Sequence, residues 1–277
     1  MDTMSDKKGI ICVVACPLLE DELIHSMFTD PQPKRILVAD NEHAVSIKRK
    51  MDARGMRYEM ISEKEFFDRR DNIDREQYNI MILMNSLGLH AEPGDLKKKV
   101  EDDILRIGSS CDCISLYYGL CGNAMWDPVE WAKKKVDVPV HIFRGCDGEI
   151  CDDCVGVAVS GTKRYLQLLK NHPGQLLVIP AMAENWEEFL QHMDMMQGAS
   201  SMDMDKYEYM RWMFELCGYE FAVKIDTGLG DHDLYEVKSK ELADSVGLKL
   251  IEGEPEFINR FSTDDMYEKS KAELPDA

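Results

Sequence analysis

Long apolar runs are missing from the 277-residue sequence, in which the longest such run covers only residues 10–19. A helix that spans a membrane needs roughly 18 apolar residues, so this run is too short. The N-terminus is polar, and residues 10–19 are typical of a buried strand rather than of a signal peptide. The sequence therefore predicts a soluble, cytoplasmic protein.

Positive charge is also scarce, because 33 lysines and arginines stand against 52 aspartates and glutamates and leave a formal net charge of −19. Binding to nucleic acid depends on a basic surface that neutralises phosphates, and binding to an anionic membrane surface depends on basic clusters. The composition thus argues against both classes of partner.

Several motifs that identify enzymes are absent. The sequence contains no phosphate-binding GxxxxGK loop, no GxSxG nucleophile elbow, no HExxH zinc motif, no Rossmann GxGxxG turn and no kinase motif set. The DxHxxG pattern of corrinoid-carrying proteins is missing too. A Pro/Gly/Ser-rich linker and a clean internal repeat are also lacking, so the sequence predicts no sharp domain boundary.

Short apolar runs alternate with polar, helix-like stretches along the chain. Each run has the length of a strand, is rich in residues that favour strands and is flanked by turn residues. The predicted strands cover residues 10–16, 35–39, 78–84, 113–118, 138–143, 175–179, 221–225 and 248–251. This alternation predicts an α/β fold built of βαβ units on a parallel sheet.

The organisation expected from this pattern is a single α/β unit over residues 1–277. It is either undivided or folded as two Rossmann-like lobes of about residues 1–110 and 111–260. Residues 186–217 are Met-rich and are predicted as a helical crossover that returns the chain to the first lobe. The segment 261–277 is charged and is expected to fray as a tail.

Nine cysteines are an unusual number for such a chain. An odd number in a cytoplasmic protein argues against a disulfide framework, which leaves metal binding or thiol chemistry as the leading interpretation. Cys16 ends a predicted strand, and Cys121 and Cys146 each follow one after a short turn. Because ligands of parallel sheets bind outside the carboxyl ends of the strands, these three thiols are expected to converge at one rim.

A second group of thiols follows directly, since Cys146 is followed by Cys151 and Cys154. A Cys-x-x-Cys pair can hold one metal ion, as it does in zinc and iron–sulfur sites. Zinc, an iron–sulfur cluster or a cobalt-type centre are the candidates, because thiolates prefer soft or borderline metals. Arg144 and Asp226 lie at strand ends on the same rim and are candidate cofactor-binding residues, with an ion pair or a turn as the alternative.

The remaining cysteines are assigned to other places. Cys111 and Cys113 precede their strand and therefore lie at the opposite end from Cys121. Cys12 and Cys217 lie inside apolar segments and are predicted to be buried in the core, as free cysteines commonly are. Because free cysteines are so often buried, the alternative interpretation is that all nine cysteines are structural.

The sequence resembles a domain-of-unknown-function family whose members occur in methanogenic archaea and anaerobic bacteria. The most specific similarity is the run Tyr118-Gly119-Leu120-Cys121-Gly122-Asn123. Further similar features are Ala15-Cys16 after the first strand, Asp153-Cys154, Trp186, and the segments 161–165, 171–174 and 235–252. The resemblance covers most of the chain.

By this resemblance, the recurring cysteines of the family correspond to Cys16, Cys121 and Cys154. The segment 145–152, which carries Cys146 and Cys151, is longer than its counterpart in the family. The family is often encoded beside corrinoid-dependent methyltransferase systems. This context implies a role in anaerobic one-carbon metabolism, with a corrinoid or methyltransferase protein as partner.

Three functions follow as hypotheses. The first is a metal- or cluster-binding protein involved in methyl transfer, with Cys16, Cys121 and Cys154 as ligands and Cys146 and Cys151 as extra or alternative ligands. The second is a non-enzymatic accessory protein or metallochaperone that serves a corrinoid or iron–sulfur partner. The third is a small-molecule-binding α/β protein whose cysteines are structural.

Overall fold

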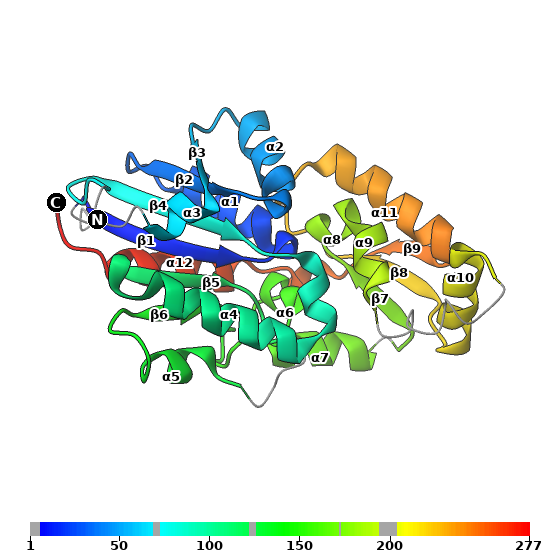
Figure 1. The fold of residues 1–277 in the computed structure, drawn as a ribbon. Coiled ribbons are helices and arrows are strands. Elements are labelled where there is room, and N and C mark those ends of the chain that lie inside the picture. The colour runs from blue at the N-terminus through cyan, green and yellow to red at the C-terminus, as the bar shows by residue number, and fades with distance from the viewer. Residues whose placement is uncertain (1–5, 69–72, 122–125, 172, 194–203) are drawn as a thin grey trace.

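The computed structural model describes residues 6–68, 73–121, 126–171, 173–193 and 204–277 (Figure 1). Within these residues the strands form two parallel sheets, which we name the first and the second sheet. The first sheet has six strands in the order β3-β2-β4-β1-β5-β6, and the second has three in the order β7-β8-β9. The start of β1 and the C-terminus lie at the end of the first sheet that is remote from the second, where Lys7 pairs with Asp276 (Figure 1).

The strands match the predicted pattern closely. The first sheet consists of β1 (Gly9–Ala15), β2 (Arg35–Asp40), β3 (Glu59–Ser62), β4 (Tyr78–Met84), β5 (Cys113–Tyr117) and β6 (Val140–Ile142). The second consists of β7 (Gln175–Val178), β8 (Phe221–Lys224) and β9 (Lys249–Glu252). The predicted α/β fold with parallel strands is confirmed. Only β3 escaped prediction, because its two apolar residues stand between polar ends.

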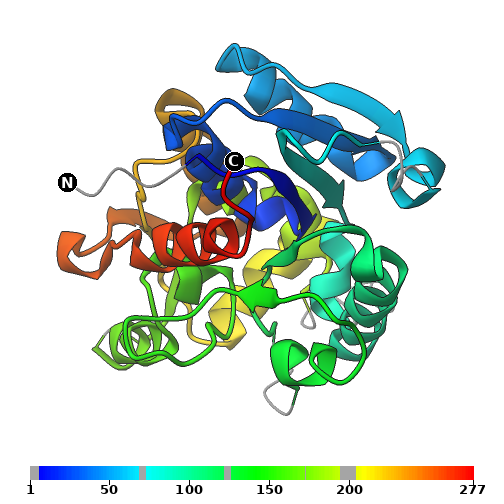
Figure 2. The ribbon, with the colours of Figure 1, turned by 90° about the vertical axis from the view of Figure 1, so that its left-hand side faces the viewer.

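Helices cover both faces of the first sheet (Figure 2). One face packs against α1 (Glu20–Thr29), α2 (Val45–Ala53) and α12 (Phe261–Ala272). The other packs against α3 (Glu63–Asp68), α4 (Pro93–Ile107), α5 (Pro128–Ala132), α6 (Cys154–Ala158) and α7 (Thr162–Asn171). The second sheet packs against α8 (Pro180–Glu184), α9 (Trp186–Gln191), α10 (Lys206–Leu216) and α11 (His232–Val246).

Burial on both faces explains why the central strands are apolar at nearly every position. Along β1, Cys12 and Val14 belong to the core on the α4 face, whereas Ile11 and Val13 belong to the core on the α1 face. The core on the α4 face continues into the second sheet, where it includes Val223 of β8. The two sheets therefore share one continuous apolar core.

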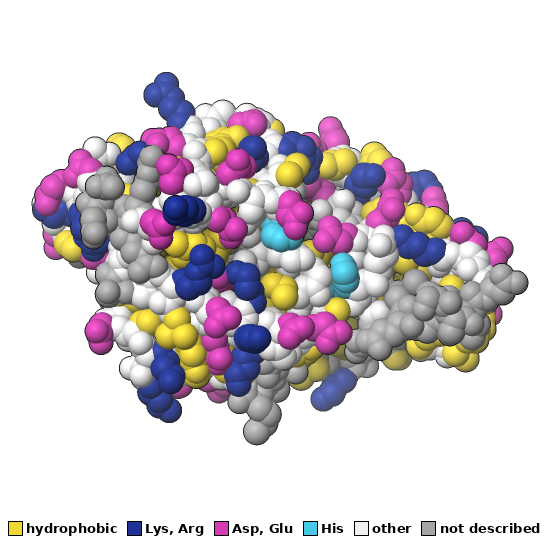
Figure 3. Space-filling view, in the orientation of Figure 1, with side chains coloured by type: hydrophobic (Ala, Val, Ile, Leu, Met, Phe, Trp, Pro, Cys, Tyr) yellow, Lys and Arg dark blue, Asp and Glu magenta, His cyan; other side chains and the backbone are white. Residues whose placement is uncertain are grey.

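None of the helices in the described ranges combines the length and the apolar character that crossing a membrane requires. On the face shown in Figure 3, acidic and basic side chains are interspersed.

The C-terminal segment is ordered, so the prediction of a frayed tail is wrong. Helix α12 packs against β5, β6 and α1. Much of its buried surface is polar: the Ser115 hydroxyl donates a hydrogen bond to Ser270 Oγ at 2.8 Å, and Lys271 Nζ donates to Asp30 Oδ1 at 2.7 Å. Buried hydroxyl and charged groups produce no apolar periodicity, which is why the sequence pattern indicated a solvated tail.

The Met-rich segment 186–217 forms α9 and α10 where it is described, and residues 194–203 lie outside the described residues. It connects β7 to β8 within the second sheet, whereas the return to the first sheet is made by α12. The predicted division between residues 110 and 111 does not coincide with the two sheets, because β5 and β6 pair with the first sheet.

Candidate functional site

A cavity of about 620 Å³ lies where the two sheets meet. The first sheet and its loops contribute Cys16, Tyr118, Cys121 and Cys154 to its wall, and β7 and the helices around it contribute the opposite side. The cavity lies outside the carboxyl ends of the neighbouring strands β1 and β5, which are followed by helices on opposite faces of the sheet. Ligands of open α/β sheets bind at such a point.

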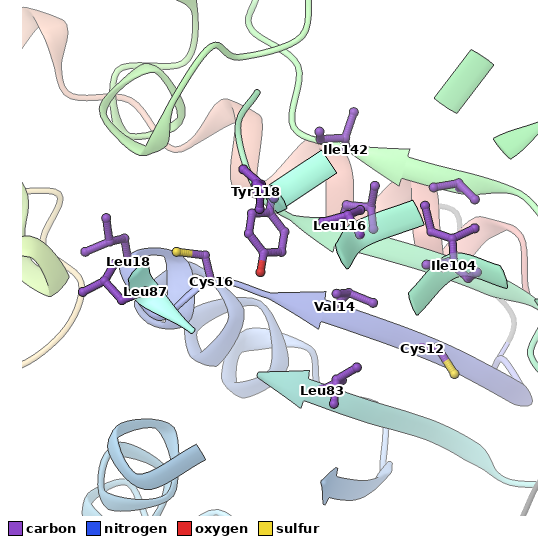
Figure 4. Close-up of a cluster of buried hydrophobic side chains, with 14 of the residues drawn as sticks. Cys12, Val14, Cys16, Leu18, Leu83, Leu87, Ile104, Leu116, Tyr118 and Ile142 are labelled. Carbon is purple, nitrogen blue, oxygen red and sulfur yellow. The ribbon is translucent and has the colours of Figure 1, made fainter. Parts of the chain in front are cut away.

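Cys16 reaches this cavity because it directly follows β1. Ala15 of β1 pairs with Tyr117 of β5, and the Cys16 backbone N–H donates to the Tyr117 carbonyl at 3.1 Å. Cys16 thereby continues the alternation of β1 on the α4 face. Figure 4 shows its sulfur between the ring of Tyr118 and the side chain of Leu18.

Cys121 and Cys154 are brought together by a short backbone pairing between two loops. The Leu120 N–H donates to the Cys151 carbonyl at 3.1 Å, and the Cys121 N–H donates to the Asp152 carbonyl at 2.6 Å. The two loops approach so closely at Gly119 that a Cβ there would lie 2.5 Å from the Asp153 Cα. Cys154 follows at the start of α6 and also lines the cavity.

Gly119→Ala is expected to lower the free energy of unfolding by about 2 kcal/mol, because the added methyl group collides with backbone atoms that cannot rotate away. Chemical denaturation measures this change. Gly94→Ala, at a position in α4 with open space around the Cβ, is the matched control and should not destabilise the protein. Equal stability of the two variants would contradict the close approach at Gly119.

The backbone of Cys121 adopts a left-handed conformation, with a φ of 49°. Ser160 is the only other non-glycine residue with a positive φ among the described residues. This conformation is uncommon for residues other than glycine, and such outliers cluster at functional sites. Gly122 and Asn123, which complete the motif noted in the sequence, lie outside the described residues.

Each of the three thiols that line the cavity has a pKa raised above its ordinary value. Burial raises the pKa of Cys16 to about 12. Burial, the nearby Cys16 and Asp153 raise the pKa of Cys121 well above its ordinary value. Burial, Asp153 and the other two thiols do the same to the pKa of Cys154. Cys16 contributes to the raised pKa of both Cys121 and Cys154, so it lies within electrostatic range of both.

Acidic groups accompany the thiols. Asp152 and Asp153 both line the cavity. The Asp153 carboxylate caps α6 by accepting from the Gly156 N–H at 2.7 Å, and burial raises the pKa of Asp153 to about 6. No Lys or Arg occurs among the described residues that line the cavity. A cation in this space would therefore meet carboxylates and thiols without competition from a protein ammonium or guanidinium group.

Cys146 and Cys151, predicted as extra or alternative ligands, lie elsewhere in the structure. Cys146 is exposed on the loop after β6. Cys151 is fully buried on the α1 face of the core, with its Sγ 3.6 Å from Ser262 Oγ. Neither residue lines the thiol cavity. Of the Cys-x-x-Cys pair, therefore, only Cys154 lines the cavity, although it also packs against the core that contains Cys151.

Arg144 and Asp226 also lie away from the thiol cavity. Arg144 donates from Nη1 to the Gly148 carbonyl at 2.9 Å and lines a separate cavity of about 60 Å³. The Asp226 carboxylate accepts from the Gly228 N–H at 2.9 Å, which is the geometry of a turn.

The predictions for the other four cysteines are right for three of them and wrong for one. Cys111 and Cys113 are buried at the start of β5, at the opposite end from Cys121, as predicted. Cys12 is buried as predicted, but the prediction for Cys217 is wrong, because this residue is exposed at the end of α10. The apolar character of α10 extends around the helix, so the sequence did not reveal which side faces solvent.

The rest of the cavity wall was not predicted from the sequence. Its polar and aromatic members are His90, Tyr165, Gln175, Phe189, His192 and Tyr219. The ring of His90 stacks on that of Phe189 at a centroid distance of 5.1 Å. Gln175 is buried, and its Oε1 has no hydrogen-bond partner among the described residues. The one signal of this wall in the sequence was that a polar residue begins an otherwise apolar strand.

The three thiols share a cavity without forming a preassembled metal site. Among the residues that the structure describes, no three Cys, His, Asp or Glu side chains are grouped closely enough to hold a metal ion. Sulfur atoms bound to one tetrahedral zinc ion at about 2.3 Å stand roughly 4 Å apart. The donor types suit zinc or an iron–sulfur cluster, but loading requires some of these side chains or their loops to rearrange.

Comparison with known proteins gives one match. A family model described as a protein of unknown function, DUF1638, matches residues 84–259. This range includes Cys121, Cys154 and the second sheet, and it begins after Cys16. No match to the sequence is found among the curated proteins or among the solved structures.

Proposed function

We propose that this protein, which belongs to the DUF1638 family of proteins of unknown function, binds a soft metal centre in its thiol-lined cavity. The observation that carries the proposal is the convergence of Cys16, Cys121 and Cys154, from three separate segments of the chain, on one cavity. Zinc or an iron–sulfur cluster is the proposed centre, since thiolates prefer soft and borderline metals.

The charges around the cavity support this proposal. Thiols must lose their protons to bind a metal, and the metal supplies the positive charge that the cavity lacks. When bound, a zinc ion lowers the pKa of a coordinating thiol and so provides nucleophilic sulfur, which is the chemistry of methyl transfer. A role in anaerobic one-carbon metabolism beside a corrinoid or methyltransferase protein is part of the proposal and is supported by the sequence resemblance alone.

A second candidate function is a small-molecule-binding protein whose thiols stay protonated. Two observations favour it: the described donor groups are not assembled as a ligand set, and the cavity of about 620 Å³ is much larger than one metal ion. An accessory role in metal delivery would use the same cysteines and would differ in how fast the metal exchanges.

The decisive experiment is anaerobic purification followed by metal analysis and a visible absorption spectrum. We expect about one zinc ion per chain without colour, or iron with sulfide and a brown colour. Cys121→Ser is expected to weaken metal binding by roughly 100-fold, because it removes a ligand. Cys217→Ser changes an exposed cysteine outside the cavity, serves as the matched control, and should retain the metal.

Each outcome has a distinct meaning. Absence of metal from the wild-type protein after reconstitution would overturn the metal proposal and favour the small-molecule-binding function. Unchanged metal content in Cys121→Ser would overturn the assignment of Cys121 as a ligand. Metal that exchanges within seconds would favour the accessory role over a catalytic one.

A further inference from the structure

We infer that the space beside the three thiols binds a small organic ammonium ion that carries at least one N–H donor. The inference rests on the proposed function, because it assumes that the thiol-lined cavity is the functional site. It specifies the chemical class of the ligand that binds in the part of the cavity beside the thiols.

The size of the cavity provides the first argument. Its volume of about 620 Å³ lies within the range of small-molecule sites, which extends from about 300 to 1,000 Å³. A metal centre held by Cys16, Cys121 and Cys154 would occupy only the end formed by the first sheet. The end formed by Gln175, the second sheet and its helices remains available for an organic ligand.

Charge provides the second argument. The described lining includes Asp152 and Asp153 but no Lys or Arg, so an anionic ligand would be desolvated without a compensating charge. Loading with a metal preserves this preference, since a divalent ion with three thiolates carries a net charge of +2 − 3 = −1. A positively charged ligand is favoured in both states of the cavity.

The aromatic side chains provide the third argument. Tyr118, Tyr165, Phe189 and Tyr219 all line the cavity. Aromatic faces attract organic ammonium groups through their electron-rich surfaces, and this attraction strengthens when water is excluded. The stacking of His90 on Phe189 holds one of these rings in place. An ammonium ion with apolar substituents therefore suits both the aromatic and the acidic parts of the wall.

The side chain of Gln175 is the reason that the ligand is expected to carry an N–H donor. Its side chain lines the cavity and is only 7% exposed, and its Oε1 accepts no hydrogen bond from any described residue. This oxygen is itself enclosed, so the Gln175 side chain has to turn toward the cavity to meet a ligand. A buried acceptor without a donor is costly, so a ligand N–H that pairs with it is favoured. A quaternary ammonium ion lacks such a donor, whereas a tertiary one has it.

Isothermal titration of the full chain with four probes of similar size tests the inference. The probes are trimethylammonium, tetramethylammonium, tert-butanol and pivalate, each titrated into metal-free and metal-loaded protein. We expect trimethylammonium to bind about tenfold more tightly than tert-butanol and pivalate not to bind. Gln175→Leu should weaken trimethylammonium binding by about tenfold and leave tetramethylammonium binding within about twofold.

Gln167→Leu, at an exposed position of α7 outside the cavity, is the control and should leave both affinities unchanged. Binding of pivalate or tert-butanol as tight as that of the cations would overturn the inference, as would the absence of binding by every probe. Cation binding that survives in Cys121→Ser after its metal is lost would support the inference independently. Retained metal without cation binding would overturn the inference and leave the proposed metal function intact.

Discussion

Lys50→Met is expected to lower the free energy of unfolding by about 3–5 kcal/mol at pH 7. Lys50 lies on α2 and is only 8% exposed. Its Nζ is 2.7 Å from Asp21 Oδ1, 2.9 Å from Glu20 Oε1 and 3.2 Å from Glu184 Oε2. One ammonium group thus pairs with three buried carboxylates, and its removal leaves their charges with far less compensation.

The environment of these carboxylates explains the size of the effect. Each has one oxygen that is buried without a hydrogen-bond partner among the described residues: Glu20 Oε2, Asp21 Oδ2 and Glu184 Oε1. Burial opposes the charged form of Lys50, but the three carboxylates outweigh that effect and hold the pKa of its ammonium group above its ordinary value. Breaking a buried ion pair by removing one partner is strongly destabilising, because the remaining charge stays desolvated.

Chemical denaturation at pH 7 and pH 5 checks this prediction. The loss is expected to shrink at pH 5, because burial raises the pKa of Glu20 and the carboxyl can take up a proton once Lys50 is gone. Lys48→Met, on the same helix, is the control and should change stability by less than about 0.5 kcal/mol. A loss of less than about 1 kcal/mol for Lys50→Met would show that its ion pairs do not carry this part of the fold.

The same network connects the two sheets, since Lys50 lies on α2 beside the first sheet and Glu184 lies on α8 beside the second. Arg49 also reaches Glu184, with its Nη2 2.7 Å from Oε2. A double-mutant cycle of Lys50→Met and Glu184→Gln therefore measures the energetic coupling across this junction. Additive effects would mean that the contact does not couple the two sheets.

Glu22→Gln is expected to stabilise the protein at alkaline pH and to leave its stability nearly unchanged at pH 4. Glu22 lies in α1 and is 3% exposed, and its Oε2 is buried without a hydrogen-bond partner among the described residues. Burial, followed by the charge of Asp21, raises the pKa of Glu22 from 4.5 to about 8. The folded protein therefore keeps this carboxyl protonated at a pH at which the unfolded chain has released the proton.

The sign of the pH dependence follows from this difference. Below pH 4.5 both states are protonated and Glu22 has no effect on stability through ionisation. Between pH 4.5 and about 8 the folded state binds more protons than the unfolded state, so stability falls as pH rises. At about 1.4 kcal/mol per pH unit, the upper bound of the loss is about 5 kcal/mol, and we expect Glu22→Gln to recover about 2 kcal/mol at pH 9.

Denaturation of wild type and Glu22→Gln from pH 4 to pH 9 measures the effect. The difference in stability between the two proteins should grow through this range and level off above about pH 8. Glu187→Gln, at an exposed position of α9, is the control and should show no such growth. A constant difference across the range would contradict a buried, protonated Glu22. Burial is the main cause of the raised pKa of Cys154, and the charge of Glu22 adds a small contribution to it.

The sequence alone determined the fold class, eight strands and the positions of Cys16 and Cys121 near strand ends. These features depend on local information, because an apolar run bounded by turn residues marks a buried strand wherever it occurs. The parallel arrangement then brings the ends of β1 and β5 to one edge, as the pairing of Ala15 with Tyr117 illustrates. The resemblance to a domain family of unknown function was also visible in the sequence, and the match to the family model confirms it.

Only the tertiary structure decided which thiols share the cavity and what lies opposite them. Cys154 lines the cavity, whereas Cys151 lies in the core on the α1 face with its Sγ beside Ser262 Oγ. The backbone pairing with Leu120 and Cys121 holds the loop in this position. Gln175 of β7, Phe189 of α9 and Tyr219, which precedes β8, reach the cavity from the second sheet and its helices, far along the chain. Local patterns carry no information about such contacts, since they depend on packing between segments that are distant in sequence.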